Sequence, residues 1–439
     1  MAALLAGCGC AKKPNALTPA EEAQARDLPV AIRDYKATGW PWDPKDLVSN
    51  KPVNPADDAA PLIKMAASLI PRSAPIDLGE RPKEGHFDEY KKELDSCKAA
   101  LDQGVLASNK RILSWGHLDY DSRPPDEVFS AQHLARVFCK RAVVRAHFGD
   151  ARGACQDLQT AWRFAKLLGQ TPVLVGADTG FAVEYIMLVA YQLSAAELKG
   201  NVPALQKLIK CIQTCGPPSA ADLENVVRGE ACMSISVARL GGPDVLDGSQ
   251  GLSGDGALDQ ARALADQWIR ADVQRADLFT KERGNMAAIR AQMLLLDPTD
   301  PFAFGRDTEH PSDAGIVVPF INAAAQLALT KCFLNAMLVQ AQTGHFPAAV
   351  SEIPGTWVDP IDGKPLRLKA NGDSIRIYSV GQDAKDDGGK DRSEVDENAK
   401  SGFDIVAAYP PIPPPKPKKS TYIQNLSRAY SRDVLQGPQ

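Results

Sequence analysis

Apolar residues recur every three or four positions over most of this chain, from about Pro61 to Thr343, and the pattern changes abruptly after Gly344. Spacings of three and four place apolar side chains along one face of a helix, whereas alternation is typical of strands. The sequence therefore predicts an α+β protein, with a mostly α-helical array followed by a small antiparallel β-sheet. We expect a helical domain over residues 30–310 and a helix-plus-sheet module over residues 311–409.

The clearest helical unit lies between Asp126 and Leu168. Asp126–Phe148 is predicted to form one helix, and Gly149 and Asp150 end it and cap the next. The second helix has small and apolar residues at spacings of four and three: Ala154, Leu158, Ala161, Ala165 and Leu168. Small alanines let two helices approach closely, so we predict an antiparallel hairpin that resembles a tetratricopeptide unit. Regular repeats are too few for a solenoid, and we expect an irregular array.

Two segments, Val173–Ala195 and Ala314–Ala341, are more apolar than the rest of the helical region. Each is long enough to cross a bilayer, which takes about 20 apolar residues. The first contains Asp178 and Glu184, and the second contains five residues that are unfavourable in lipid, namely Pro319, Asn322, Gln326, Lys331 and Asn335. Charged and strongly polar side chains are costly in the hydrocarbon region of a membrane. We therefore predict that both helices are buried inside the protein.

Three short segments after Gly344 are β-branched or alternate in polarity, and we predict a strand in each: Pro365–Lys369, Ser374–Val380 and Phe403–Ala408. The dipeptide Asn371-Gly372 between the first two strongly indicates a hairpin turn. One small sheet is only marginally stable alone, so we expect it to pack on the preceding helix, Ala314–Thr343. Residues 410–439 are rich in proline and lysine and are predicted to form an extended, disordered tail.

The N-terminus carries the most specific short motif of the chain, Leu5-Ala6-Gly7-Cys8. This motif resembles a bacterial lipobox, in which small residues fit a signal peptidase and the cysteine thiol accepts a diacylglycerol. Residues 1–29 are then a lipoprotein signal remnant and a tether, because the polar stretch after Cys8 suits a flexible connection. The resemblance implies an exported protein that the lipid on Cys8 anchors to a membrane of the bacterial cell envelope.

Charge and motifs argue against several functional classes. The chain has 50 Lys and Arg residues against 54 Asp and Glu residues, and nucleic-acid binders normally show a basic excess, so we expect no nucleic-acid partner. Its six histidines form no HExxH motif, and it contains no GxSxG, no P-loop and no GxGxxG after a strand. We therefore predict a protein that is not an enzyme, and we assign no catalytic residue.

The spacing of Cys211 and Cys215 can be interpreted in two ways. The chain has nine cysteines, none in a zinc-ribbon or CxxC pattern. Cys211 and Cys215 are four positions apart on a predicted helix, which places them on one face, so a metal site or a disulfide is one interpretation. The other, which we favour, is that both are small core residues on a helix face.

An acidic segment is the strongest candidate for binding chemistry. Asp383, Asp386 and Asp387 lie close together in the sequence and are flanked by glycines. Carboxylates held this close repel one another unless a cation neutralises them, and hard oxygen ligands suit Ca²⁺. A calcium-binding loop is therefore one hypothesis, and a solvated acidic loop without an ion is the other.

Four motifs follow one another in the last third of the chain: His345-Phe-Pro-Ala-Ala, Val358-Asp-Pro-Ile-Asp-Gly-Lys-Pro-Leu366, Ile377-Tyr-Ser-Val-Gly-Gln-Asp383 and Gly402-Phe-Asp404-Ile405. The series resembles the C-terminal domain of the major pseudopilin of type II secretion. In that family a loop between the last strands binds calcium, and Asp383 and Asp404 match its two aspartate positions, with Asp386 and Asp387 inside the same loop. The whole layout resembles uncharacterised lipoproteins of planctomycete-type bacteria.

Two functions remain open at this point. The first is a non-catalytic, membrane-anchored envelope protein that presents its helical surface and a calcium-stabilised module to protein partners. The alternative is an envelope hydrolase with a carboxylate pair hidden among the helices. An enzyme should show a deep pocket where carboxylates with perturbed pKa values converge, whereas a scaffold should show a concave, mostly polar helical face.

Overall fold

The computed structural model describes residues 30–47, 53–70, 85–114, 124–240, 257–282, 285, 288–289, 292–293, 313–381, 384–395 and 403–412. The predicted tether with Cys8, Asp383 of the predicted calcium loop and the predicted tail from residue 413 onward lie outside these residues. The helices are α2 (Ala60–Ser68), α3 (Phe87–Ser96), α4 (Lys98–Ser108), α5 (Asp126–His147), α6 (Ala151–Leu168), α7 (Leu174–Glu197), α8 (Val202–Ile212), α9 (Ala220–Leu240), α11 (Ala257–Lys281) and α13 (Asp313–Thr343). With the three strands described below, they confirm the predicted α+β fold.

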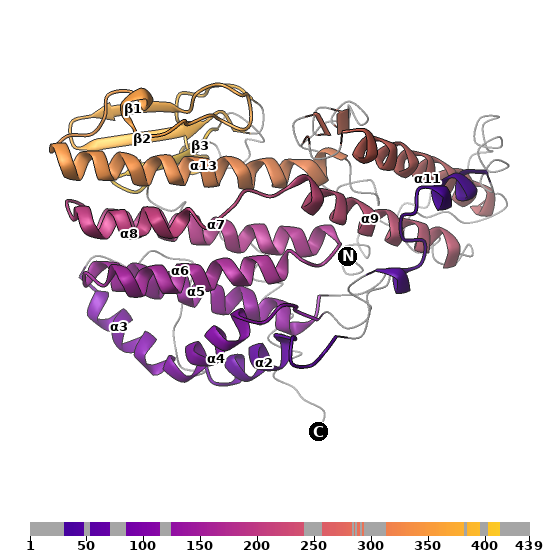
Figure 1. The fold of residues 1–439 in the computed structure, drawn as a ribbon, viewed down its shortest axis with the longest axis horizontal. Helices are drawn as coiled ribbons and strands as arrows, with labels where there is room; N and C mark the ends of the chain where they lie inside the picture. The colour runs from indigo at the N-terminus through magenta and orange to yellow at the C-terminus, as the bar shows by residue number, and fades with distance from the viewer. Residues whose placement is uncertain are drawn as a thin grey trace.

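Figure 1 shows these elements stacked in layers. The sheet covers α13, and α7 and α8 lie on the other side of that helix. The hairpin of α5 and α6 forms the next layer, followed by α2, α3 and α4. At one end of the stack, α9 and α11 pack against each other. The helix α13 thus lies between the helical array and the sheet.

The hairpin that we predicted between Asp126 and Leu168 is present as α5 and α6. Gly149 turns the chain with a φ of +79°, and the Asp150 carboxylate accepts a hydrogen bond from the Gly153 N–H at 2.8 Å, which caps α6. The predicted apolar face of α6 is buried along its length: Ala154, Leu158, Ala161, Ala165 and Leu168. The small side chains on this face let α5 and α7 approach α6 closely.

The two most apolar helices of the sequence are α7 and the later part of α13. Among the described residues, Leu174–Glu197 and Ile316–Thr343 are long and apolar enough to cross a membrane by length and composition, with mean hydropathies of 1.3 and 1.5. About half of each stretch is buried inside the protein, because α7 packs against α5, α6 and α13, and α13 packs against α7, α8 and the sheet. Both helices thus lie inside the array, as we predicted.

A second hydrophobic cluster holds the N-terminal part of the described chain. Tyr35 and Trp40 are buried there, and the Trp40 ring lies 6.3 Å from the ring of Phe279 in α11. The guanidinium of Arg228 in α9 lies 5.7 Å from the centre of the Trp40 ring. Residues 30–47 therefore pack against both α9 and α11.

The strands β1 (Arg367–Asn371), β2 (Ser374–Ser379) and β3 (Ile405–Tyr409) form an antiparallel sheet in the order β1-β2-β3. Asn371 pairs with Ser374 across the predicted hairpin turn, where Gly372 has a φ of +56°. The sheet packs on α13, as we predicted (Figure 1). Ile377 of β2 is completely buried in the same cluster as Phe333 of α13, which is the apolar contact that a small sheet needs for stability.

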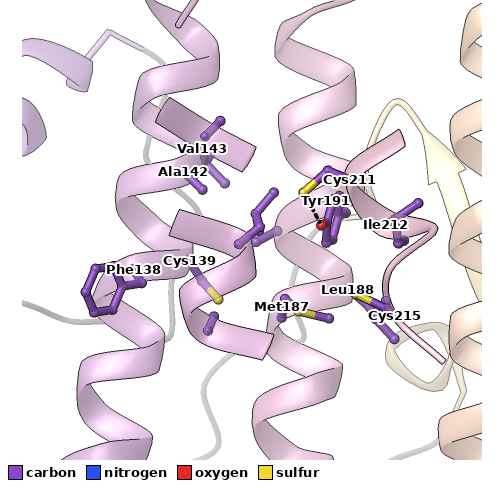
Figure 2. Packing of buried hydrophobic residues seen from close by; sticks show 14 of the residues in the cluster. Phe138, Cys139, Ala142, Val143, Met187, Leu188, Tyr191, Cys211, Ile212 and Cys215 are labelled. Carbon is purple, nitrogen blue, oxygen red and sulfur yellow. Dashed lines mark hydrogen bonds between the residues drawn. The ribbon is translucent and has the colours of Figure 1, made fainter. Parts of the chain in front are cut away.

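One hydrophobic cluster runs through both predicted domains. It contains the cores of α5, α6 and α7, Phe333 and Leu334 of α13, and Ile375 and Ile377 of β2. Figure 2 shows its centre, where Met187 of α7 and its neighbours lie between side chains of α5 and those of the α8 region. The array and the sheet are therefore joined by apolar packing through α13.

A buried carboxylate connects the turn before the sheet to the strands. Asp359, which belongs to the pseudopilin-like turn motif, is completely buried. Its oxygens accept hydrogen bonds from Arg367 Nη1 at 2.6 Å, Ser379 Oγ at 2.8 Å and the Val380 N–H at 3.1 Å. Since these donors belong to β1 and to the end of β2, the turn motif has a structural role.

Candidate functional site

A cavity of about 420 Å³ lies where the helical array meets the sheet. Its walls come from α7, the first half of α13, the start of the short helix η5 (Arg392–Glu394) and the residues that enter β3. Much of the wall is apolar: Phe181, Leu188, Val189, Phe403, Ile405 and Val406. Amide and carboxylate side chains and the basic side chain of Arg392 complete it. A concave, largely apolar site with a few polar groups is the usual form of a ligand-binding pocket.

One face of α7 lines the cavity. Its side chains follow the 3-4-3-4 spacing of a helix face: Asp178, Phe181, Tyr185, Leu188 and Gln192. The beginning of α7 is fixed by the neighbouring helix α9, because the Leu174 N–H donates a hydrogen bond to Glu230 Oε1 at 2.5 Å. That carboxylate acts as a cap on the first turn of α7, so α9 helps to set the position of the cavity-lining face.

The facing wall comes from the first half of α13, with the side chains of Pro319, Asn322 and Gln326. At the end of this wall the Gln192 amide donates a hydrogen bond from Nε2 to Thr330 Oγ1 at 2.9 Å, which connects α7 to α13. The two helices are therefore held at a fixed separation where the cavity ends.

The polar residues that interrupt the two apolar helices converge on this cavity. Four polar residues named in the sequence line it, Asp178, Glu184, Asn322 and Gln326, together with Pro319. The other two, Lys331 and Asn335, lie further along α13 and do not line it. In the sequence these residues indicated only that the two apolar helices do not span a membrane, so the cavity was not predicted. Polar residues spaced along one face of each of two apolar helices are the pattern that could have revealed it.

Asp178 is the carboxylate with the most unusual environment in the cavity. It is half-buried, and burial raises its pKa from 3.8 to about 6 because desolvation disfavours the charged form. Within the described part of the chain, it forms no hydrogen bond or ion pair. A carboxylate without a counter-charge in a partly apolar site has a high affinity for a cationic group.

The other carboxylates that line the cavity have structural partners. Glu184 forms an ion pair with Lys166 at 3.0 Å, although burial still raises the pKa of Glu184. Asp404 accepts a hydrogen bond from the Gly389 N–H at 2.6 Å. The Asp391 carboxylate caps η5 by accepting a hydrogen bond from the Ser393 N–H at 2.8 Å. Among the described lining carboxylates, Asp178 is therefore the one available to a ligand.

The predicted calcium residues that the structure describes are Asp386, Asp387 and Asp404. Burial raises the pKa of Asp404, and the nearby charges of Asp386 and Asp387 raise it further. The Asp387 N–H donates to Asp404 Oδ1 at 3.3 Å, and Asp386 Oδ1 accepts from the Gly388 N–H at 2.9 Å. Asp387 Oδ2 is buried and accepts no hydrogen bond from the described residues. Such an oxygen is the kind of ligand that Ca²⁺ takes.

The described residues alone do not complete a metal site. They contain no group of three or more His, Cys, Asp and Glu side chains placed to hold a metal ion. Asp383 lies outside them, as does Cys8, the predicted lipidation residue. Asp386, Asp387 and Asp404 thus offer carboxylate oxygens, the ligand type that Ca²⁺ prefers, without forming a complete site among the described residues, and the calcium site stays a prediction.

The structure corrects the predicted geometry of Cys211 and Cys215. The helix α8 ends at Ile212, so Cys215 lies beyond it and the two residues do not share a helix face. Both side chains are buried. The thiol of Cys211 donates instead to the backbone oxygen of Cys155 in α6, at 3.5 Å. The spatial neighbour of Cys211 is therefore on another helix.

Comparison with known proteins identifies no relative, since no family model, no curated protein and no solved structure matches the chain.

Proposed function

We propose that this chain is a non-catalytic cell-envelope lipoprotein that binds an extended segment of a protein partner in the cavity between α7 and α13. The observation that carries the proposal is the Asp178 carboxylate, which has no hydrogen-bond or ion-pair partner among the described residues and lies in a largely apolar cavity. A segment that offers one basic side chain among apolar ones complements both features, because the basic group supplies the missing counter-charge.

The remaining lining groups suit an extended peptide. Asn322 and Gln326 present side-chain amides, which donate to and accept from the backbone groups of a peptide. Phe181, Ile405 and Val406 offer apolar surface to its alternate side chains. Tyr185, half exposed at 53%, lies at the edge of the cavity, where an aromatic ring can cover the bound segment.

The proposed location of the protein is the envelope, on the evidence of the lipobox-like motif that ends at Cys8. A lipid on Cys8, followed by the polar tether to residue 29, leaves the folded part free to meet partners near the membrane surface. Calcium bound by Asp383, Asp386, Asp387 and Asp404 would stiffen the loop that ends in β3. Because Asp404 also lines the cavity, an ion there would stabilise one wall of the binding site.

Titration calorimetry with a defined peptide tests the binding proposal. The probe is a pentapeptide of valines with a central lysine, and its control peptide has norleucine in place of the lysine. We expect the lysine peptide to bind at pH 7 and the Asp178→Asn variant to bind it at least about tenfold more weakly, since a charged hydrogen bond contributes about 1.5–3 kcal/mol. The norleucine peptide should bind both proteins equally weakly.

The matched control variant is Asp277→Asn, which removes an exposed carboxylate of α11 that does not line the cavity. It should bind the lysine peptide as the unmodified protein does. Equal affinity of the Asp178→Asn variant and the unmodified protein for this peptide would contradict the proposed site.

An envelope hydrolase is the second candidate, favoured by one observation. A pKa of about 6 for Asp178 is in the range of a general acid that works near neutral pH. Glu184, the other carboxylate of α7 at the cavity, is paired with Lys166, so it would have to leave that ion pair to act as the partner base. Release of soluble fragments from purified envelope polymers, lost in the Asp178→Asn variant, would favour the hydrolase over the binding protein.

A further inference from the structure

Three cysteines and a tyrosine gather where α6, α7 and α8 meet. Cys211 of α8 donates its thiol to the backbone oxygen of Cys155 in α6 at 3.5 Å. The Tyr191 hydroxyl of α7 lies 3.0 Å from Cys211 Sγ, as the dashed line in Figure 2 shows. Cys215 follows shortly after the end of α8. Among the described residues, all the cysteines are free thiols.

Cys155 and Cys211 lie against each other across the contact of α6 with α8, since Cys211 Sγ is 3.5 Å from the backbone oxygen of Cys155. Their mutual hydrogen bond raises the pKa of Cys155 and lowers the pKa of Cys211, for which Tyr191 provides a further hydrogen bond to the sulfur. The two cysteines come from helices that pack against each other. Disulfides join residues on closely packed elements, so this pair is a candidate for one.

The two thiols differ in exposure. Cys211 is buried, at 5% exposed, whereas Cys155 is only partly buried. A small disulfide reagent from solvent therefore meets Cys155 first. Cys211 lies against Cys155, and hydrogen bonds with Cys155 and Tyr191 lower the pKa of its thiol.

We propose that Cys155 and Cys211 form a disulfide that joins α6 to α8 when the protein meets an oxidising low-molecular-weight disulfide. The bond would connect the helices on either side of α7 in the chain, and α7 carries the cavity-lining face. Cys215 is a poorer partner, because it lies beyond the end of α8 and burial raises its pKa to about 12. This proposal is independent of what the cavity binds.

The reaction is an exchange in two steps with a reagent RSSR. The Cys155 sulfur, after losing its proton, forms a bond to one sulfur of RSSR and breaks the S–S bond, so that RS⁻ leaves and takes up that proton. The Cys211 thiolate then bonds to Cys155 Sγ and expels the second RS⁻, which takes up the Cys211 proton. The protein loses two hydrogen atoms and two electrons, and RSSR becomes two RSH. The first step should be the slow one, because Cys155 is the less acidic thiol.

Peptide mapping of the folded full chain tests the proposal directly. Reduced protein is incubated with oxidised glutathione at pH 8, the free thiols are blocked with N-ethylmaleimide, and the digest is analysed without reduction. We expect a linked peptide pair containing Cys155 and Cys211, and a decrease of about 2 Da in protein mass for the disulfide before blocking. No variant is needed for this observation, so it does not depend on the folding of a mutant.

Four single variants, one of them a control, separate the proposed pair from its neighbours. Cys155→Ser and Cys211→Ser should each abolish the linked pair, whereas Cys215→Ser and the control Cys139→Ser, a buried residue of α5, should leave it unchanged. A linked pair that instead joins Cys211 to Cys215 would overturn the assignment. The protein can also be incubated with oxidised glutathione and then unfolded in the presence of N-ethylmaleimide. Full alkylation of both Cys155 and Cys211 in that experiment would overturn the proposal as well.

Discussion

Replacing Asp178 by asparagine should stabilise the protein at neutral pH. The two side chains have nearly the same shape, so the cavity keeps its form and only the charge is removed. In the folded protein, burial raises the pKa of Asp178 from 3.8 to about 6. The folded state therefore binds the proton more tightly than the unfolded chain does, and ionisation of Asp178 opposes folding.

The magnitude follows from the difference between the two pKa values. One pKa unit corresponds to 1.36 kcal/mol, so the shift from 3.8 to about 6 corresponds to about 3 kcal/mol. The sign is set by the raised folded-state pKa: the contribution of Asp178 to stability is fully present below pH 3.8 and is lost as the pH rises through 6. We expect the Asp178→Asn variant to match the unmodified protein near pH 4 and to exceed it by about 3 kcal/mol at pH 7.

Urea denaturation followed by circular dichroism, repeated from pH 4 to pH 8, measures this difference as a function of pH. The control is Asp277→Asn in α11, where the carboxylate is exposed; its stability difference should stay near zero at every pH. An Asp178→Asn variant whose stability difference is the same at pH 4 and at pH 7 would refute the reasoning, because only a titrating group produces a pH-dependent difference.

Three further results are expected. Asp359→Ala should lower the free energy of unfolding by about 3 kcal/mol in urea denaturation, because it removes a completely buried acceptor of several hydrogen bonds; a loss below about 1 kcal/mol would contradict the structural role. Calcium at 100 times its Kd should stabilise the protein by about 2.7 kcal/mol in thermal melts, and Asp386→Asn with Asp387→Asn should remove the effect; equal melting in calcium and in chelator argues against the site. Cys8→Ser should release the protein from membranes in fractionation, and retention would exclude the lipid anchor.

The fold was largely predictable because its signals are local. The buried face of α6 has the spacing of three and four that any amphipathic helix shows, and the hairpin of β1 and β2 follows from the turn preference of Asn371-Gly372. The order of the layers was not predictable to the same extent. The packing of residues 30–47 on α9 and α11 depends on side chains such as Trp40 and Phe279, which are far apart in the sequence.

The candidate site, in contrast to the fold, could not be predicted from the sequence. Asp178 and Glu184 were visible in the sequence as exceptions in an apolar helix, and so were Asn322 and Gln326. Nothing in the sequence indicated that the two helices face each other across a cavity, since their contact joins parts of the chain that are far apart. The proximity of Cys155 and Cys211 was hidden for the same reason, whereas the predicted common helix face of Cys211 and Cys215 is absent because α8 ends at Ile212.

The buried carboxylates of this protein divide into two groups with different consequences. Asp359 and Glu184 are each paired with a basic side chain, so the cost of burying their charge is offset inside the fold. Asp178 has no such partner among the described residues, so a bound cationic group would supply a counter-charge that this carboxylate otherwise lacks there. A bound cationic group would lower the pKa of Asp178, so ligand binding and loss of the proton are thermodynamically linked. The affinity for a basic ligand should therefore rise as the pH rises through about 6, where the free folded protein loses the Asp178 proton.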